Sequence, residues 1–218
     1  MSEADKSMKD CLKNIPGYLN YLYRGYYVPK DLKEALETDE DVILHLSDTP
    51  SSAYRSVLRL IEFLKPRVII HTGDLADDIK LELFPDLSFL YNEKAVPFLL
   101  EMEKSTAEEI YIVPGNHDLA GLLEEAAGRS RIVPDGTVIE IRDLKVGLAH
   151  CQEDLPPAVD YNLYGHNLDC PADGNPCTLN GCSKINIILS PSKRVYQVPY
   201  PVGTNQERQY NPLNGRLL

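Results

Sequence analysis

The chain has 218 residues, of which 43% are hydrophobic and 25% charged, as expected for one globular domain with an extension. Its formal net charge is −11, and this acidic balance argues against non-specific nucleic-acid binding and disfavours a DNA-processing nuclease. No apolar run approaches the length of a membrane span, and the N-terminus lacks the apolar core of a signal peptide. The five unevenly spaced cysteines indicate reduced thiols, so the predicted location is cytoplasmic, without membrane association.

The sequence divides into three parts. Residues 1–40 are predicted to form a helical extension, with five tyrosines in the stretch 18–27 and a polar helix candidate over 30–37. The extension is interpreted as packing on the core, and a partly ordered leader is the alternative. The main domain is predicted over 41–199. Residues 200–218, rich in Pro, Gly, Asn and Gln, are predicted to form a coil tail on the surface.

In the first part of the main domain, apolar runs alternate with helix candidates. The predicted strands are Val42–Leu46, Val68–Ile70 and Ile110–Val113. The predicted helices are Tyr54–Leu64, ended by Pro66; Leu87–Lys104, kinked or started near Pro97; and Leu119–Ala127. This alternation predicts an α/β fold with a parallel sheet and right-handed crossovers.

After Gly128, short strand candidates follow one another without helices between them. They are Ile132–Val133, Val138–Ile141, Val146–Ala149 and Tyr161–Tyr164. Ile185–Leu189 and Arg194–Val198 are expected to form a closing hairpin. The pattern predicts a second, more antiparallel sheet.

Polar side chains follow the predicted strands. Asp48 follows the first apolar run, Asp74 the second and Asn116 the third, and two later strands end in His150 and His166. Because the carboxyl ends of parallel strands line one crevice, we expect these five side chains to meet. They are ligands suited to Mn, Fe, Zn or a similar divalent ion. The sequence therefore predicts a metal centre.

The motifs around these residues resemble those of the calcineurin-like metallophosphoesterases. They are GD-x-x-D at Gly73–Asp77, GNHD at Gly115–Asp118, the strand-ending His150, and GH at Gly165–His166. The resemblance covers roughly residues 42 to 198. It implies a four-layer αββα sandwich with two adjacent metal ions, where a metal-activated water attacks the phosphorus.

The resemblance also implies a role for each ligand. Asp74 would bridge the two ions. Asn116, His150 and His166 would complete the shell of the second ion, and Asp48 would belong to the first.

Two further residues receive catalytic roles from the same resemblance. His117 would contact the scissile phosphate and protonate the leaving oxygen. Asp77 would pair with His117 and hold its imidazolium.

His45 and His71, which lie in or at the end of predicted strands, are expected to be core histidines or to orient ligand carboxylates.

The chain departs from the family's pattern at the first metal. Asp48-Thr49-Pro50 replaces the family's D-x-H, and Leu168 stands where GH-x-H has its last histidine. We expect Pro50 at the first position of the next helix, capped by Thr49.

Three explanations remain open for the missing histidines. The enzyme works with one tightly bound ion and a loosely held second one; or Asn167, Asp169 or Cys170 rebuilds the first site; or the domain has lost catalysis. We predict a metal-dependent phosphoric ester hydrolase with one or two ions, acting on a small phosphomonoester or phosphodiester. The alternative is a catalytically weak scaffold that binds a partner protein. The presence of His117 and Asp77 favours the hydrolase, since a scaffold needs no general acid.

Overall fold

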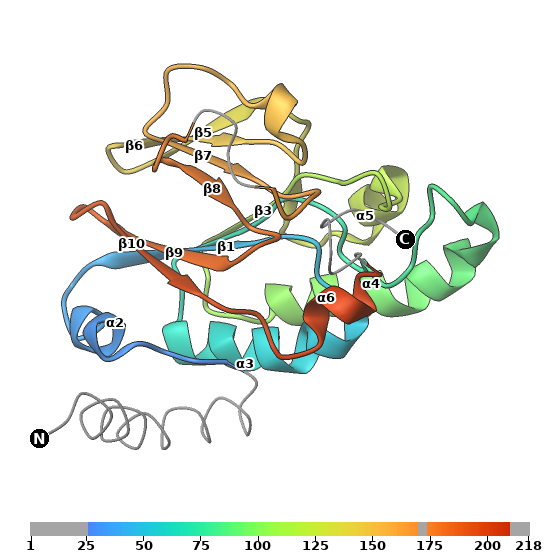
Figure 1. Ribbon diagram of the computed structural model, residues 1–218, viewed down its shortest axis with the longest axis horizontal. Helices are drawn as coiled ribbons and strands as arrows, with labels where there is room; N and C mark the ends of the chain where they lie inside the picture. The colour runs from blue at the N-terminus through green and yellow to red at the C-terminus, as the bar shows by residue number, and fades with distance from the viewer. Residues whose placement is uncertain (1–25, 170–173, 210–218) are drawn as a thin grey trace, which may run out of the picture.

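The computed structural model describes residues 26–169 and 174–209. Within these ranges, ten strands form two sheets, with α-helices along one side (Figure 1). Most of the predicted tyrosine-rich extension (1–25), Cys170 and the end of the predicted tail (210–218) lie outside the described residues.

The larger sheet has six strands in the described part of the chain, in the order β10-β9-β1-β2-β3-β4. Its parallel strands are β1 (Asp41–Leu46), β2 (Val68–His71), β3 (Glu109–Ile112) and β4 (Arg131–Ile132). The antiparallel pair β9 (Ile185–Ser190) and β10 (Arg194–Val198) extends the sheet beyond β1. The predicted parallel sheet and the closing hairpin are therefore confirmed, and the hairpin belongs to this larger sheet.

Helices cover the face of the larger sheet that lies away from the second sheet (Figure 1). The helices on that face are α2 (Lys30–Ala35), α3 (Tyr54–Leu64), α4 (Ser88–Glu103) and α6 (Thr204–Glu207), and α5 (Ala120–Ala126) lies to one side of the sheets. Two short turns, η1 (Ser51–Ala53) and η2 (Pro85–Leu87), precede α3 and α4. In α3 the buried residues recur at helical spacing, at Val57, Leu60, Ile61 and Leu64, so one stripe of the helix packs on the sheet. Pro97 lies inside α4, which continues past it.

The smaller sheet runs in the order β5-β6-β7-β8 within the described residues. Its strands are β5 (Thr137–Ile141), β6 (Leu144–Leu148), β7 (Tyr161–Tyr164) and β8 (Thr178–Asn180). Only β5 and β6 are antiparallel, whereas β6, β7 and β8 are parallel. The expectation of an antiparallel sheet thus holds for its first pair alone. The sequence gives no signal for β8, because its three residues follow a polar loop and show no periodicity.

Two apolar layers hold these elements together. Successive residues of a strand point to opposite faces, so Leu44 packs with the helices while Ile43 packs between the sheets. The predicted α/β sandwich is confirmed. In the part of the chain that the structure describes, the turn η3 (Gln152–Asp154) and loops, instead of long helices, lie beyond the smaller sheet (Figure 1). None of the described helices has the length and apolar character needed to cross a membrane.

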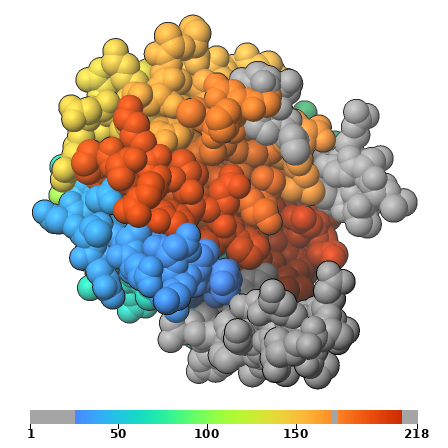
Figure 2. Space-filling model, turned by 60° about the vertical axis from the view of Figure 1, so that its left-hand side comes forward, coloured from blue at the N-terminus to red at the C-terminus, as the bar shows by residue number. Residues whose placement is uncertain are grey.

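The described ends of the chain pack against the domain. The predicted helix of the extension forms α2, whose Leu32 and Ala35 are buried. Figure 2 shows the segment of α2 (blue) beside the β9–β10 hairpin (orange-red), and Glu40 forms an ion pair with Arg194 there. The expectation of surface coil after residue 199 is wrong for the described residues, since α6 forms and Arg208 is fully buried.

Candidate metal centre

Three of the predicted ligands have an unusual backbone conformation. Asp48, Asp74 and His166 have φ angles of 49°, 57° and 71°, and each lies just after a strand, β1, β2 or β7. Few residue types other than glycine adopt this left-handed region, and Asp, Asn and His do so most readily. The turn places each side chain in the cluster at the strand ends, and strain of this kind concentrates at functional sites.

Neighbouring glycines allow the loops to approach closely. A Cβ on Gly73 would lie 2.4 Å from Nδ1 of His150, and one on Gly165 would lie 2.3 Å from Oδ2 of Asp48. Only glycine fits such contacts without moving the ligands.

The side-chain atoms of Asn116, His150 and His166 converge on one point. Asn116 Oδ1 lies 3.0 Å from His150 Nε2 and 3.1 Å from His166 Nδ1, and the two nitrogens lie 3.2 Å apart. Asp74 Oδ2 is 3.5 Å from His150 Nε2. Ligand atoms bound to one ion at about 2.0–2.2 Å necessarily lie at such separations from one another. The residues therefore fit a divalent ion at this point.

Hydrogen bonds from Nδ1 and from the backbone N–H fix the orientation of His150. Its Nδ1 lies 2.7 Å from the carbonyl oxygen of Thr72, and its backbone N–H donates to Asp135 Oδ1 at 2.6 Å. With Nδ1–H donated to a carbonyl, Nε2 faces Asn116 and Asp74, and it carries the lone pair when the ring is neutral. This is the arrangement that metal-binding histidines adopt.

The field in the crevice favours a cation. Burial by itself lowers the pKa of His150, but the carboxylates of Asp74 and Asp48 outweigh burial and raise it to about 9. Burial raises the pKa of Asp74 to about 7, which shows how poorly this carboxylate is solvated. A bound divalent ion would compensate the same negative charge.

Asp48 belongs to the same cluster. One ligand atom each of Asp48, Asp74 and His150 lies within 4.8 Å of the others. Asp48 Oδ2 also accepts a hydrogen bond from the backbone N–H of His166, at 3.0 Å. The structure thus brings together all five residues that the sequence analysis named as metal ligands.

The two predicted catalytic residues lie next to this cluster, but they are not hydrogen-bonded to each other. His117 and Asp77 each place a ligand atom within 4.8 Å of Asp74 and of one another. The carboxylate of Asp77 instead forms a buried ion pair with Lys80, so the expected pairing of Asp77 with an imidazolium is not the one in the structure. Burial, followed by the charge of Lys80, lowers the pKa of His117 to about 4, which keeps its ring neutral at pH 7.

The part of the centre around Asp48, where the first metal ion is predicted, is called the first-metal half below. Among the described residues, Asn167 and Asp169 do not replace its missing histidines. Asn167 Oδ1 accepts a hydrogen bond from the backbone N–H of Asp169, so this amide closes its own turn, and Asp169 is exposed. Rebuilding by these two residues is therefore not supported, and Cys170 lies outside the described ranges.

The segment after Asp48 also differs from the prediction. Pro50 precedes η1 instead of starting a helix, and Asp78 accepts from both the N–H and the hydroxyl of Ser51, at 2.7 Å each. Thr49 is not the cap, because its hydroxyl pairs with His71 Nε2 at 2.9 Å.

Asp118 is a residue that the sequence analysis quoted but gave no role. Its Oδ2 accepts from the backbone N–H groups of Asp74 (2.7 Å) and Gly115 (2.9 Å), and its Oδ1 accepts from the N–H of Leu75 (2.9 Å) and the hydroxyl of Tyr91 (2.7 Å). Asp118 therefore ties the loop after β2 to the loop after β3. The sequence signal for Asp118 is its place as the final residue of the GNHD motif.

The surroundings of His45, His71 and Cys151 indicate that these residues do not take part in proton transfer or nucleophilic attack. Burial lowers the pKa of His45 and of His71 to about 3, so both rings are neutral in the core. The Sγ of Cys151 lies within 4.8 Å of ring nitrogens of His150 and His166. Burial and nearby carboxylates raise the pKa of this thiol to about 12, which excludes a thiolate nucleophile at neutral pH.

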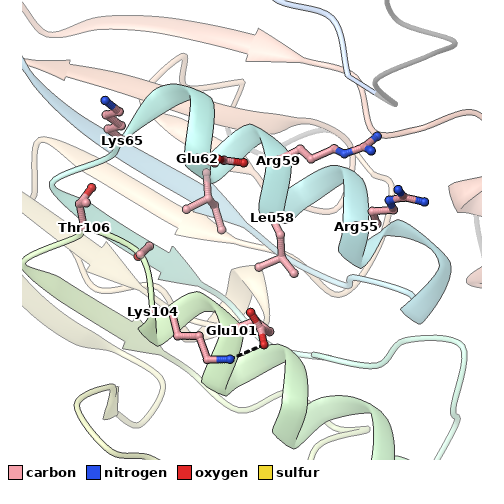
Figure 3. Close-up of a pocket in the computed structure, with 10 residues that line it drawn as sticks. Arg55, Leu58, Arg59, Glu62, Lys65, Glu101, Lys104 and Thr106 are labelled. Atoms are coloured by element: carbon pink, nitrogen blue, oxygen red, sulfur yellow. Dashed lines mark hydrogen bonds and ion pairs between the residues drawn. The ribbon is translucent and has the colours of Figure 1, made fainter.

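A separate hollow lies between α3 and the end of α4 (Figure 3). It measures about 600 Å³, and its lining includes four basic side chains, Arg55, Arg59, Lys65 and Lys104. None of the predicted ligands or catalytic residues lines it, so it is distinct from the strand-end cluster.

One family profile and several solved structures are similar to this chain. The sequence profile described as calcineurin-like phosphoesterase matches residues 42–179. Among solved structures, an archaeal phosphodiesterase is 20% identical, with 72% of this chain and 98% of that chain covered and a TM-score of 0.48. YfcE, a phosphoesterase from E. coli, is 18% identical, with 73% and 99% covered and a TM-score of 0.46. A comparison with curated protein sequences gives no match.

Proposed function

Because this chain belongs to the calcineurin-like phosphoesterase family, we propose that it is a metal-dependent phosphoesterase with one tightly bound divalent ion. The proposed substrate is a small phosphomonoester or phosphodiester. The observation that supports it best is the convergence of Asn116 Oδ1, His150 Nε2 and His166 Nδ1 within 3.0–3.2 Å of one another, next to Asp74.

The proposed ligands are Asp74, Asn116, His150 and His166, with Asp48 beside them. An ion bound there would supply Lewis acidity toward a phosphoryl oxygen and lower the pKa of a bound water. The imidazole, amide and carboxylate donors suit Mn, Fe or Zn. The role of the chain is to fix the ligands before the ion arrives, through the Thr72 carbonyl on His150 and the three strand-end turns.

His117 is the proposed proton donor to the leaving oxygen. It is 1% exposed, and its backbone N–H donates to Asp74 Oδ1 at 2.9 Å, which holds the residue against the proposed centre. A neutral ring cannot donate a proton to a poor leaving group. The negative charge of a bound phosphoester would raise the pKa of His117, because an adjacent anion favours the imidazolium.

The test combines metal content with hydrolysis. Protein purified without chelators should contain about one metal ion per chain and hydrolyse bis-p-nitrophenyl phosphate with added manganese. His150→Ala and His166→Ala should each lower manganese affinity by more than about 100-fold, because loss of a ligand costs more than loss of a supporting contact. Asp169→Asn, an exposed acid in the same loop region, is the matched control and should bind as the wild type does. Metal content unchanged by both histidine substitutions would contradict the assignment.

A second candidate function rests on a different surface. Leu83, Phe84 and Phe89 are 53%, 56% and 70% exposed around η2 and the start of α4. Exposed apolar clusters of this kind mark protein-interaction sites. In this alternative the domain is a scaffold with little or no turnover. It would be favoured if the metal-loaded protein hydrolysed no phosphoester, while Phe84→Ser/Phe89→Ser abolished the capture of a partner from cell extract.

A further inference from the structure

The half of the centre that lacks its histidines is rich in buried charge. Asp48, predicted for the first ion, and Asp74, predicted to bridge the two ions, are 0% and 2% exposed, and the neighbouring Asp77 is 0% exposed. Three carboxylates removed from water in one place are unfavourable unless cations compensate them. In the family the first metal ion does this, but Pro50 and Leu168 replace two of its ligands here.

Lys80 supplies one of the cations. Its side chain is 2% exposed, and its ammonium group forms an ion pair with Oδ1 of Asp77. Asp77 shares a cluster of potential metal-ligand atoms with Asp74 and His117, all within 4.8 Å. A group of side chains that could hold a metal ion thus already has an ammonium group bound to one of its carboxylates.

Arg208, which follows helix α6, supplies the other cation. It is 0% exposed, and it donates from Nε to the carbonyl oxygen of Asp48 (2.5 Å), from Nη2 to that of Ser47 (3.2 Å) and from Nη1 to that of Cys182 (2.6 Å). Its Nε also lies 4.0 Å from Oδ2 of Asp77. One oxygen of Asp77 therefore faces Lys80, and the other faces Arg208.

A guanidinium group that is permanently charged and bound to three carbonyls cannot leave to admit an ion. A divalent ion between Asp74 and Asp77 would meet repulsion from both cations and would compete with Lys80 for the same carboxylate. Two buried side-chain cations thus lie next to the three buried carboxylates, and Asp77 faces both of them.

We propose that Lys80 and Arg208 take the place of the first metal ion, so that the centre holds a single ion and Lys80 contacts a phosphoryl oxygen of the substrate. The inference rests on the proposed single-ion centre of Asp74, Asn116, His150 and His166. In this proposal the two ligand histidines are absent because side-chain cations replace the first metal ion. The site has therefore not decayed.

The experiment counts ions and reads their coupling. Manganese is titrated into the full chain, bound ion is measured after equilibrium dialysis, and electron paramagnetic resonance distinguishes isolated Mn²⁺ from exchange-coupled pairs. The wild type should bind one manganese with the spectrum of an isolated ion. Lys80→Ala frees the carboxylate of Asp77, and we expect a second manganese and a coupled spectrum. Lys104→Ala removes an exposed lysine on α4 and should match the wild type.

A neutral pair tests the role of the charge in catalysis. In Asp77→Asn/Lys80→Met both charges disappear together, which proteins tolerate better than loss of one partner. This variant should still bind one manganese but hydrolyse bis-p-nitrophenyl phosphate about 100-fold more slowly, since a phosphate-binding cation is gone.

Each outcome decides between the proposals. Two coupled manganese ions in the wild type, or one isolated ion in Lys80→Ala, would overturn the inference while leaving the phosphoesterase proposal intact. No bound manganese in the wild type would overturn both. The wild-type titration does not depend on any variant folding. Wild-type turnover by the neutral pair would overturn the substrate contact of Lys80.

Discussion

The two halves of the strand-end cluster differ in what lies next to their polar side chains. On one side, the ligand atoms of Asn116, His150 and His166 converge within 3.0–3.2 Å of one another. On the other side, Asp77 lies between Lys80 and Arg208, and both cations are buried. The first arrangement has room for a metal ion among its ligand atoms, whereas in the second Asp77 already faces two side-chain cations.

Under the single-ion proposal, this contrast explains how a scaffold for two ions can hold one without collapse of its fold. If two histidines were lost alone, a carboxylate cluster would remain buried without compensation. An interior lysine and an arginine from the C-terminal arm (residues 199–209) keep the cluster stable, and they keep positive charge where a phosphate would bind. The same family fold then has one half suited to a metal and one half suited to an anion.

The largest effect should come from Arg208. Arg208→Met would leave three backbone carbonyls and Asp77 without their cation, and breaking a buried charge network costs about 3–5 kcal/mol of unfolding free energy. Urea unfolding should show a much lower midpoint. Arg194→Met, which removes an exposed arginine paired with Glu40, is the control and should stay near the wild type. Equal midpoints for both variants would show that the buried guanidinium does not hold the first-metal half.

A smaller effect should come from Asp118, on the metal-binding side. Asp118→Asn places an amide N–H₂ against backbone N–H donors, so at least one charge-assisted hydrogen bond is lost, at a cost of about 1.5–3 kcal/mol. Because the loops of Asp74 and Asn116 then separate, manganese affinity should fall about 10–100-fold, as for other contacts that support ligands. Isothermal titration measures this directly. Unchanged affinity in a less stable protein would limit Asp118 to a role in folding.

The smallest effect should come from Gly165. A Cβ there would lie 1.8 Å from Ser47 Oγ, so Gly165→Ala should push the ends of β1 and β7 apart at a cost of about 1–3 kcal/mol. Gly121→Ala is the matched control, because its added Cβ meets nothing within 4 Å and alanine is about 0.5–1 kcal/mol better than glycine in a helix. Thermal unfolding should move in opposite directions for the two variants. A stabilised Gly165→Ala protein would mean that the two strand ends tolerate separation.

Much of the fold followed from sequence patterns. The apolar periodicity of α3 and the strands of the larger sheet are clear because each buries one face or both. The short strand β8 and helix α6 were missed, since their positions are decided by contacts with distant elements: Asn162 donates to the carbonyl oxygen of Cys177 beside β8, and Arg208 anchors α6.

The site was predictable to the same degree. Residues that end strands could be placed in one crevice, because parallel strands deliver their carboxyl ends to one edge. Lys80 and Arg208 could not be found in this way. Nothing local distinguishes a buried lysine from an exposed one, and Arg208 lies in a segment whose composition predicts coil. Asp118 is an intermediate case. The GNHD motif contains it, but the sequence does not predict the four hydrogen bonds that it accepts.

The arm that carries Arg208 also orders the assembly of the protein in time. Arg208 donates to the carbonyl oxygen of Asp48, which precedes it by 160 residues. During synthesis, strands β1 to β3 and the ligands Asp74 and Asn116 leave the ribosome long before that contact can form, and contacts between distant residues form late. We therefore expect Lys80 to be available to Asp77 early in synthesis, and the second cation of the cluster to be in place only once Arg208 has been added.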